Sequence, residues 1–468
     1  MLFPLPLVPF EQYMLADDGP AYPMNGVFRL RFSGRFDRPA LLSAVRAAVA
    51  RHPLLSARIE RTGRQGPVWV ADAQSEPSVE WIDGSTGKEF PTVGHLDPQR
   101  GPVFRAWVVQ DEPSETTDLV LALHHCCSDA LGAFRFIEDL LRLYDGAVRG
   151  KPTSVALPPL DERLLRRRGA FGLSPGKLLR DGLKQLVGLH GAWRFFMHRP
   201  VPLVPHKPEP RGAPVPESYP TAVTRQLSTA ETDALRRSAR ERQVTVNELL
   251  ARDLFLTLEA FQANLAPGKG LTFKGTDWLR LSVPMNLRGD SDRRLPAANV
   301  VSLVFLDRRK RHCTEAARLL AGIHREMQRI KRLRLGLTFV LSLRLLKYLP
   351  GGIARTVETD HCQSTCVFTN LGPLFVDTPL AQSDGRVVSG SLVLEGMDIL
   401  PPLRPHTCAA LCIFTYAGRL NVTLHYDARP LSKTDAESLL ETYMQNIRST
   451  LPTTETQTGD PSRGVAAA

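Results

Sequence analysis

Residues 121–134 read LALHHCCSDALGAF, with two adjacent histidines at the end of an apolar run. The run over 119–124 is typical of a β-strand, and the apolar periodicity that follows indicates a helix over about 131–144. The segment HHCCSDA therefore lies in a strand-to-helix connection, where side chains are often presented to a cleft. Because neighbouring strand residues point to opposite faces, we expect one of His124 and His125 to face a cavity and the other to pack.

Residue chemistry allows two interpretations of this histidine pair. An imidazole with an ordinary pKa of about 6.5 can act as a general base near neutral pH, with a typical benefit of roughly 10²–10⁴-fold. A pair of histidines bonded into a protein core is the commoner case, and the spacing alone does not choose between the two. The choice between a catalytic pair and a core pair depends on the surrounding sequence.

Hydrophobic periodicity and turn residues predict a mixed α and β chain. Asp37 precedes a helix with an early proline, DRPALLSAVRAAVARH. Ser228 with Glu231 and Thr245 with Glu248 form capping-box pairs that mark two further helix starts. Further helices are predicted at 314–333 and about 432–450, and strands at 27–34, 55–60, 67–71, 103–110, 278–284, 299–306, 364–369, 409–415 and 419–426.

Length and composition indicate a globular protein of more than one domain. The chain has 468 residues, of which 43% are hydrophobic and 23% charged. A basic, Pro/Gly-rich segment at 161–218 is predicted to cross between an N-terminal lobe, 1–160, and a C-terminal lobe, 219–450. The tail at 451–468 is predicted to be disordered.

HHCCSDA resembles the HHxxxDG signature of the condensation-domain superfamily, which includes nonribosomal peptide condensation domains and stand-alone polyketide-associated acyltransferases. FDRPALLSAVRAAVARHPLLSARIE at 36–60 resembles the first helix of that family and the segment after it. LSVPMNLRGD at 281–290 and ANVVSLVF at 298–305 are similar to strands of its second lobe. YAGRLNVTLHYDARPLSKTDAESLL at 416–440 resembles its closing hairpin and helix, so the likeness runs over about 20–450.

The resemblance implies an α/β (α+β) fold of two lobes, each similar to chloramphenicol acetyltransferase, in a V-shaped pseudo-dimer with the active site at the interface. By position, His125 would be the general base and His124 would support it. Asp129 would be structural and would pair with Arg288 of the second lobe. Removing one partner of such a buried pair would cost about 3–5 kcal/mol. We also expect the ring of His125 to open onto a channel between the lobes.

The motif departs from the family at Ala130, where the family has glycine. Glycine permits a tight backbone and close approach, so a methyl group there could narrow the channel or strain the turn. Gly132, two residues later, could restore flexibility. The DFGWG motif of the related plant acyltransferases is absent, which argues against that branch.

Seven cysteines, an odd number in a long chain without secretory features, indicate reduced thiols and no structural disulfides. A zinc site is disfavoured because strand residues four apart lie too far apart to chelate, and close CxxC pairs are missing. The residues considered for it are His361, Cys362, Cys366, Cys408 and Cys412. We expect no metal and no cofactor, with a CoA or phosphopantetheine thioester as substrate.

The net charge of +11 is concentrated in two segments. Residues 163–199 carry nine Lys or Arg against one Asp, and residues 308–348 carry twelve against two Glu. No nucleic-acid-binding signature accompanies them, so nucleic acid is not expected as a partner. The alternatives left open are solvated faces of amphipathic helices, an acidic carrier protein or phosphorylated donor, and peripheral contact with a membrane.

The N-terminal stretch and the apolar stretch at 335–349 are the candidates for a targeting or membrane-spanning segment. MLFPLPLVPFEQYML has three prolines within ten residues and no basic leader, and Arg344 interrupts the second stretch. We therefore expect a cytoplasmic protein, with peripheral membrane contact as an option.

The predicted function is that of a stand-alone acyltransferase, which moves an acyl group from acyl-CoA or an acyl carrier protein to a small-molecule or lipid acceptor through an alcohol or amine. Asn370 is a candidate for stabilising the oxyanion. A nucleophilic Cys126 or Cys127 is disfavoured, because immediate neighbours of a histidine rarely reach its functional atoms. A catalytically inactive scaffold that binds a carrier protein or a membrane surface, and an amide-forming peptide condensation enzyme, remain open.

Overall fold

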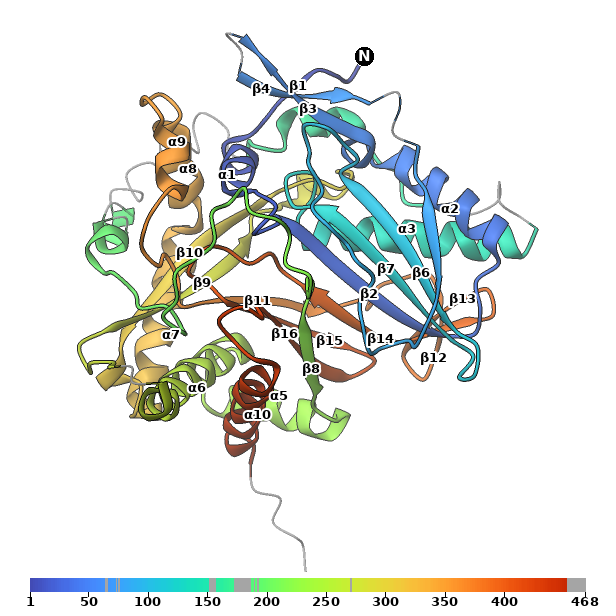
Figure 1. Cartoon of the computed structure of the whole chain (residues 1–468). Coiled ribbons are helices and arrows are strands. Elements are labelled where there is room, and N and C mark those ends of the chain that lie inside the picture. The colour runs from blue at the N-terminus through green and yellow to red at the C-terminus, as the bar shows by residue number, and fades with distance from the viewer. Residues whose placement is uncertain are drawn as a thin grey trace, which may run out of the picture.

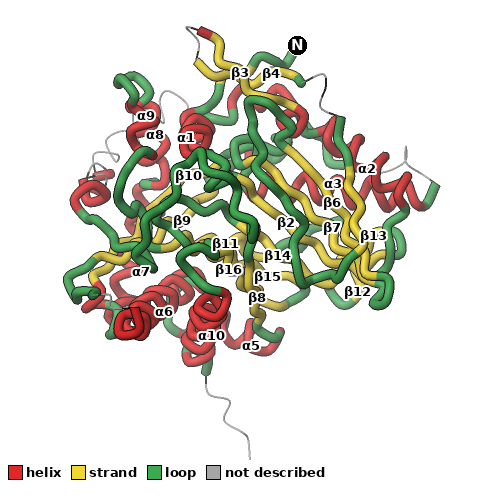
Figure 2. The backbone as a smooth tube through the Cα atoms, in the orientation of Figure 1, coloured by secondary structure: helices red, strands yellow, loops and turns green. Residues whose placement is uncertain are grey.

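The computed structural model describes residues 1–452, except 64–65, 73, 75, 151–156, 172–186, 189, 192 and 270–271. Within these residues the strands form a seven-stranded, a six-stranded and a three-stranded sheet. The predicted mixed α/β class is therefore confirmed. Figures 1 and 2 show helices beside the first large sheet, at the right, and a second group of helices below the other large sheet.

The first large sheet has the strand order β12-β13-β14-β2-β7-β6-β5. The helices α2 (Arg38–Arg51) and α3 (Ala130–Val148) pack on it and share its hydrophobic core. The strands are β2 (Asn25–Ser33), β5 (Val79–Asp83), β6 (Phe104–Asp111), β7 (Thr116–His124), β12 (Ala381–Ser383), β13 (Arg386–Ser389) and β14 (Leu392–Leu400). All neighbours are antiparallel except β5 and β6.

The second large sheet has the order β10-β9-β11-β15-β16-β8, with β11 parallel to both of its neighbours. Its strands are β8 (Ala222–Gln226), β9 (Trp278–Asn286), β10 (Val301–Arg309), β11 (Cys366–Pro373), β15 (Ala409–Tyr416) and β16 (Arg419–Tyr426). The helices α5 (Thr229–Glu241), α6 (Val246–Lys269), α7 (Ala316–Leu333) and α10 (Lys433–Ser449) accompany it, and buried residues of all four lie in a separate core.

The sequence predicts the starts of several of these elements for reasons that the structure makes visible. The side chain of Asp37 accepts a hydrogen bond from the Ala40 amide at 2.8 Å and so caps α2. The Ser228 amide donates to Glu231 at 2.7 Å, and the Glu231 amide donates back to the Ser228 hydroxyl at 3.2 Å. Thr245 and Glu248 make the same reciprocal pair before α6. Each box satisfies amides that a helix leaves unpaired.

Three strands from the second half of the chain lie in the first sheet. β14 pairs with β2 along its length, and β13 and β12 continue the sheet outward. Asp398 of β14 accepts from Arg29 of β2 at 2.7 Å and from Thr224 of β8 at 2.5 Å, so it joins the two large sheets. The predicted boundaries at 160 and 218 do not describe this crossing, and the division into independent lobes stays a prediction.

Several elements have no counterpart in the sequence predictions. They are the strands β1 (Leu5–Pro6), β5, β8, β12, β13 and β14, and the helices α1 (Pro9–Asp17), α8 (Gly336–Leu346) and α9 (Gly352–Val357). β1 forms the small sheet with β4 (Gly66–Ala71) and β3 (Ala57–Thr62), both of which were predicted. Most of the predicted disordered tail, residues 453–468, lies outside the described residues. In the described part of the chain, every helix is too short or too polar to cross a bilayer.

Candidate active site

The residues of HHCCSD connect the end of β7 to the start of α3, as the sequence predicts. His124 is fully buried, whereas His125 is only partly buried. The two rings therefore have different surroundings, and His124 is the member of the pair that packs.

His124 is held by contacts at both ring nitrogens. Its Nδ1 accepts a hydrogen bond from the Cys126 amide at 3.1 Å, and its Nε2 lies 3.4 Å from Oδ2 of Asp18. The same carboxylate oxygen lies 2.7 Å from Nε2 of His95. Since Nδ1 is the acceptor, Nε2 carries the proton that faces Asp18. His124 is therefore held in one orientation, and its supporting role stays a prediction.

Asp18 sits between two imidazoles, and its protonation follows from them. Burial raises the pKa of Asp18, but the hydrogen bonds from His124 and His95 outweigh burial and hold it well below its ordinary range. Burial lowers the pKa of His95, but the hydrogen bond to Asp18 leaves it above its ordinary value. The carboxylate therefore stays ionised behind His124. Neither Asp18 nor His95 is predicted from the sequence, since neither is near the motif in the chain.

His125 is fixed through its backbone by both halves of the molecule. Its amide donates to the carbonyl of Met24 at 2.6 Å, and its carbonyl accepts from Nδ2 of Asn299 at 2.5 Å. Asn299 also donates to the carbonyl of Cys126 at 2.8 Å. Asn299, which comes from the segment that precedes β10, was not predicted as a site residue, although it lies within the ANVVSLVF segment.

The electrostatic surroundings keep the ring of His125 neutral. Burial lowers the pKa of His125, and the nearby carboxylate of Asp129 opposes this only in part. Among the described residues, its Nδ1 has no hydrogen-bond partner. The lowered pKa favours the neutral imidazole, which is the protonation state that a general base needs.

Asp129 uses both of its carboxylate oxygens for structure. Oδ1 accepts from the Gly132 amide at 2.9 Å and so caps α3. Oδ2 accepts from Nη1 of Arg288 at 2.7 Å and from the Val300 amide at 2.8 Å. Arg288 also donates to the carbonyl of Ala298 at 2.8 Å. The contact between Asp129 and Arg288 that the resemblance implied is thus present, and it ties the motif to the second lobe.

Ala130 is accommodated without backbone strain. It is the first residue of α3, and it is not one of the non-glycine residues with a positive φ. The close approach occurs at Gly132, where an added Cβ would lie 2.4 Å from Oγ of Ser128 and 3.0 Å from the backbone of Ala298. Glycine is therefore required two positions after Ala130, where the helix start meets the second lobe.

The two cysteines of the motif lie in the interior as thiols. The Cys126 Sγ donates to the carbonyl of Glu11 at 3.4 Å, and the Cys127 Sγ donates to the carbonyl of His124 at 2.9 Å. Burial raises the pKa of both thiols well above the ordinary value. Because the thiolate is the reactive form, this environment disfavours a cysteine nucleophile.

The other predicted candidates are not joined to the motif. The Asn370 side chain accepts from the Gly372 amide at 2.9 Å and donates to Asn247 at 3.3 Å, so its amide is engaged within the second lobe. In the described part of the chain, no three His, Cys, Asp or Glu side chains are grouped to hold a metal ion. The seven cysteines are buried free thiols.

Three well-formed cavities of the described structure are lined by residues other than His125. One, of about 750 Å³, lies among β10, α7, α8 and residues 194–200. A second, of about 650 Å³, lies beside α3 and is lined by Arg135, Glu138 and Phe375 among others. The channel that we expected at His125 therefore stays a prediction.

Comparison with known proteins finds a partial match to one family model and several structures of the same fold. Residues 12–159 match the family model described as "Condensation domain". The first condensation domain of the CDA synthetase superimposes with a TM-score of 0.66 over 95% of each chain, at 16% sequence identity. The chain therefore has the fold of a condensation domain, and its first third matches the family model. Polyketide synthase associated protein 5 from Mycobacterium tuberculosis superimposes with a TM-score of 0.61 over 91% of this chain and 94% of that one, at 18% identity.

Two curated proteins from Mycobacterium tuberculosis align with part of this chain. An uncharacterized protein of strain H37Rv is 32% identical over 190 residues, which are 40% of this chain and 42% of the relative. A phthiocerol/phthiodiolone dimycocerosyl transferase is 24% identical over 238 residues, which are 49% of this chain and 52% of the relative. The chain thus spans about half the length of the curated relatives that it matches.

Proposed function

We propose that this protein is an acyltransferase that moves an acyl group from a CoA or carrier-protein thioester to an alcohol or amine, with His125 as general base. The observation that carries the proposal is the state of the His125 ring. Burial lowers the pKa of His125, which favours the neutral imidazole, and its backbone is held by Met24 from the first lobe and by Asn299 from the second.

The reaction needs one base and no redox partner. As the acceptor oxygen or nitrogen attacks the thioester carbonyl, His125 takes the proton that the acceptor loses. The tetrahedral intermediate then collapses, the C–S bond breaks, and the imidazolium returns the proton to the departing sulfur. The products are an ester or amide and a free thiol. Asp129 and Arg288 act as positioning residues, because their functional atoms are bonded to each other and to the backbone.

The similar proteins support acyl transfer as the reaction class. One similar protein is named as a transferase of dimycocerosyl groups to phthiocerol or phthiodiolone. A starter condensation domain, at 12% identity and a TM-score of 0.65, was solved in complex with C8-CoA and Leu-SNAC. We extend the thioester donor, and a lipid or other small-molecule acceptor, to this protein. We also propose a reducing, cytoplasmic compartment, since all seven cysteines are free thiols.

The alternative is a scaffold of the same fold that binds a carrier protein or a membrane surface without turnover. Ala130 gives this alternative little support, because the residue begins α3 without strain. An amide-forming enzyme would use the same base and would differ only in its acceptor.

The test is thiol release from acyl-CoA of several chain lengths in the presence of mixed alcohols and amines, with products identified by mass. We expect His125→Ala to lower the rate by about 10²–10⁴-fold, the usual contribution of a general base. His312→Ala is the matched control, because His312 is exposed. Equal rates for wild type and His125→Ala, with both proteins folded, would refute the proposal. Tight carrier binding without thiol release would favour the scaffold.

A further inference from the structure

The two basic segments found in the sequence meet at one cavity. Described residues of 163–199 and of 308–348 both line the cavity of about 750 Å³. Its wall is mostly apolar, with side chains that include Leu303, Phe305, Ile330, Phe339 and Leu346. This volume lies within the range of ordinary small-molecule sites. The basic segments therefore surround an apolar space. This arrangement is not expected if their charges serve only to solvate the faces of amphipathic helices.

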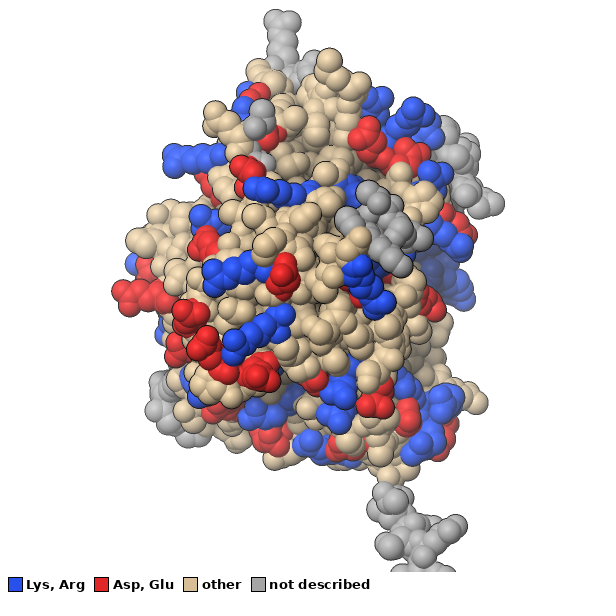
Figure 3. All heavy atoms as spheres, turned by 90° about the vertical axis from the view of Figure 1, so that its right-hand side faces the viewer, with Lys and Arg blue, Asp and Glu red and all other residues tan. Residues whose placement is uncertain are grey.

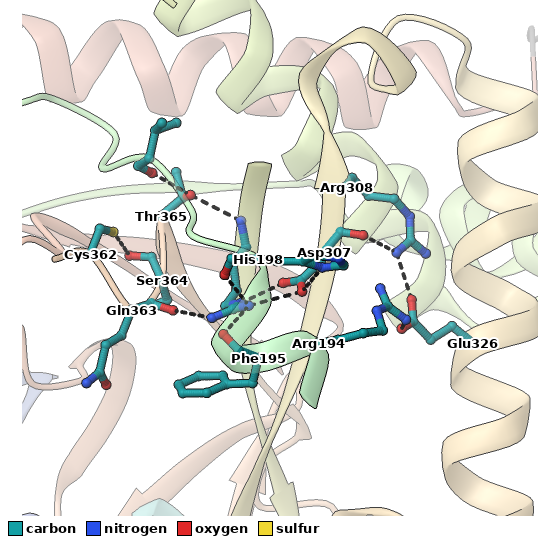
Figure 4. A network of polar contacts seen from close by, with 12 residues as sticks. Arg194, Phe195, His198, Asp307, Arg308, Glu326, Cys362, Gln363, Ser364 and Thr365 are labelled. Atoms are coloured by element: carbon teal, nitrogen blue, oxygen red, sulfur yellow. Dashed lines mark hydrogen bonds and ion pairs between the residues drawn. The ribbon is translucent and has the colours of Figure 1, made fainter. Parts of the chain in front are cut away.

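Ion pairs fix one wall of the cavity. Arg194 lies 3.2 Å from Oε1 of Glu326 on α7, and Arg308 of β10 lies 2.7 Å from Oε2 of the same residue. Figure 4 shows both guanidinium groups converging on this carboxylate. Glu326 is the acidic residue of the lining, and two arginines pair with its carboxylate.

The backbone beside Arg194 is fixed by a second polar cluster. Arg280 is buried, pairs with Asp307 at 2.6 Å, and donates to the carbonyls of Phe195 and His198 at 3.1 and 3.0 Å. The ring of His198 contacts Asp307 at 2.9 Å and stacks on Trp278 with centroids 3.7 Å apart. Residues 193–198 are thus hydrogen-bonded to β9 and β10 on the side that faces the protein. The segment is held in place without any contribution from its solvent-exposed side chains.

The outer side carries exposed apolar side chains. Six of the ten large apolar side chains that are exposed in the described part of the chain fall in two short segments, 193–197 and 345–349. We call them the apolar rim: Trp193, Phe196, Met197, Leu345, Tyr348 and Leu349, each between 55% and 76% exposed. Phe196 and Leu349 also line the cavity, so the rim stands at its mouth. Such a cluster marks an interaction site, since single exposed residues would be scattered.

Exposed arginines accompany the apolar rim. We call Arg199, Arg325, Arg329 and Arg355 the arginine rim, since all four line the cavity and are exposed. None of the four has an ion pair with a described residue. Glu326, the acidic residue nearest in the chain to Arg325 and Arg329, pairs instead with Arg194 and Arg308. Glu358 and Asp360, the acidic residues nearest to Arg355, are exposed and lie outside the lining. By contrast, the face in Figure 3, at the right of Figure 1, shows acidic and basic side chains interspersed.

We propose that the two rims dock on an anionic lipid bilayer, and that the cavity between them receives a hydrophobic chain from that bilayer. Aromatic and aliphatic side chains flanked by Arg enter the interface between headgroups and acyl chains, while the guanidinium groups bind anionic headgroups. An acidic protein would match the arginines, but it would not call for six outward apolar side chains beside an apolar cavity. The inference deepens the proposed function by naming a membrane as the source of the lipid substrate.

The first experiment is co-sedimentation of the full chain with vesicles. Equimolar phosphatidylcholine and phosphatidylglycerol is compared with phosphatidylcholine alone. We expect binding to the mixed vesicles that weakens with salt. Arg325→Glu/Arg329→Glu should weaken binding by more than the roughly fivefold that loss of one surface arginine produces. The control is Arg237→Glu/Arg240→Glu, which changes two exposed arginines of α5 and should bind as wild type does.

The second experiment tests the apolar rim. Phe196→Ser/Leu349→Ser should lose most vesicle binding, whereas Val148→Ser, at an exposed position at the end of α3, should not. Vesicles should shift the tryptophan emission to the blue and protect it from acrylamide, and Trp193→Phe should abolish both effects. The other tryptophans provide a constant background because they are more buried.

The outcomes separate this inference from the acyltransferase proposal. His125→Ala should bind vesicles as wild type does, since binding needs no turnover. The inference would be overturned if wild type did not bind anionic vesicles, or if the rim variants bound as well as their controls. Neither result would bear on the acyltransferase proposal. Salt-sensitive binding of an acidic carrier protein through the same arginines, without vesicle binding, would also overturn it. Vesicle binding without thiol release would refute the acyltransferase and retain the docking surface.

Discussion

Asp129 and Arg288 are 159 residues apart in the chain, and their side chains meet with Oδ2 2.7 Å from Nη1. The two residues do not depend on each other equally. Asp129 also accepts from two backbone amides, whereas Arg288 has the carbonyl of Ala298 as its other main partner. The carboxylate is therefore the centre of the junction between the lobes.

We expect Asp129→Ala to lower the free energy of unfolding by about 3–5 kcal/mol, because it leaves a cation and two amides without their acceptor. Arg288→Ala should cost about 1–3 kcal/mol, since the amides still satisfy the carboxylate. Urea unfolding measures both. Arg293→Ala removes an exposed pair with Asp290 and should stay within about 0.5 kcal/mol. Equal costs for Asp129→Ala and Arg288→Ala would contradict this order.

The carboxylate of Asp18 orders two imidazoles, and Asp18→Asn should uncouple them. Without the anion, burial becomes the dominant influence on His95, so the pKa of His95 should fall from above to below about 6.5. An NMR titration of the histidine ring protons measures this shift. Asp97→Asn is the control, because Asp97 raises the pKa of His95 less than Asp18 does, and it should change the titration only slightly.

Gly132 and Ala130 should respond in opposite ways to a change of one methyl group. Gly132→Ala should lower the free energy of unfolding by about 1–3 kcal/mol, since its Cβ would clash with Ser128 and the backbone of Ala298. Ala130→Gly should cost at most about 1 kcal/mol, the difference in helix propensity. Thermal and urea unfolding test both. A large loss of stability in Ala130→Gly with none in Gly132→Ala would contradict a close contact at Gly132.

His425 should make the protein sensitive to acid. It is buried on β16, its Nδ1 donates to the carbonyl of Pro401 at 2.6 Å, and burial lowers its pKa to about 4. Between about pH 6.5 and pH 4 the unfolded chain binds a proton at this residue that the folded chain does not. Stability should therefore fall as the pH falls, and the contribution of His425 across this window is about 3 kcal/mol.

The measurement is urea unfolding of wild type and His425→Asn from pH 7 to pH 4, since the asparagine amide can still donate to Pro401. The variant should lose stability less steeply than wild type. His312→Asn, at an exposed site, should follow wild type. Parallel curves for wild type and His425→Asn would exclude His425 as the source.

Local pattern was sufficient for much of the fold. β2, β9 and β16 alternate or run apolar over their length, and the capping pairs before α5 and α6 are visible as spaced residue types. Their signals lie within the element itself, so no partner has to be known. The small strands β12 and β13 were missed because most of their residues carry no such pattern, and they form only against neighbours.

The site was predictable only as far as the motif reaches. His124, His125 and Asp129 are adjacent in the chain, and Arg288 was inferred from a resemblance between whole segments. Asp18, His95 and Asn299 contact the motif through single side chains from other parts of the chain. No periodicity or spacing marks such a residue, because its role depends on which strands and loops the fold brings together. Tertiary contacts therefore supplied what local sequence does not encode.

The position of β14 beside β2 has a consequence for how the chain matures on the ribosome. Until residues 392–400 emerge, one edge of β2 has no neighbour, although β2 and β7 are already synthesised. An open strand edge of nine mostly buried residues invites pairing with other nascent chains. Fragments that stop before β14 should therefore precipitate when expressed, and the first lobe is completed only near the end of translation.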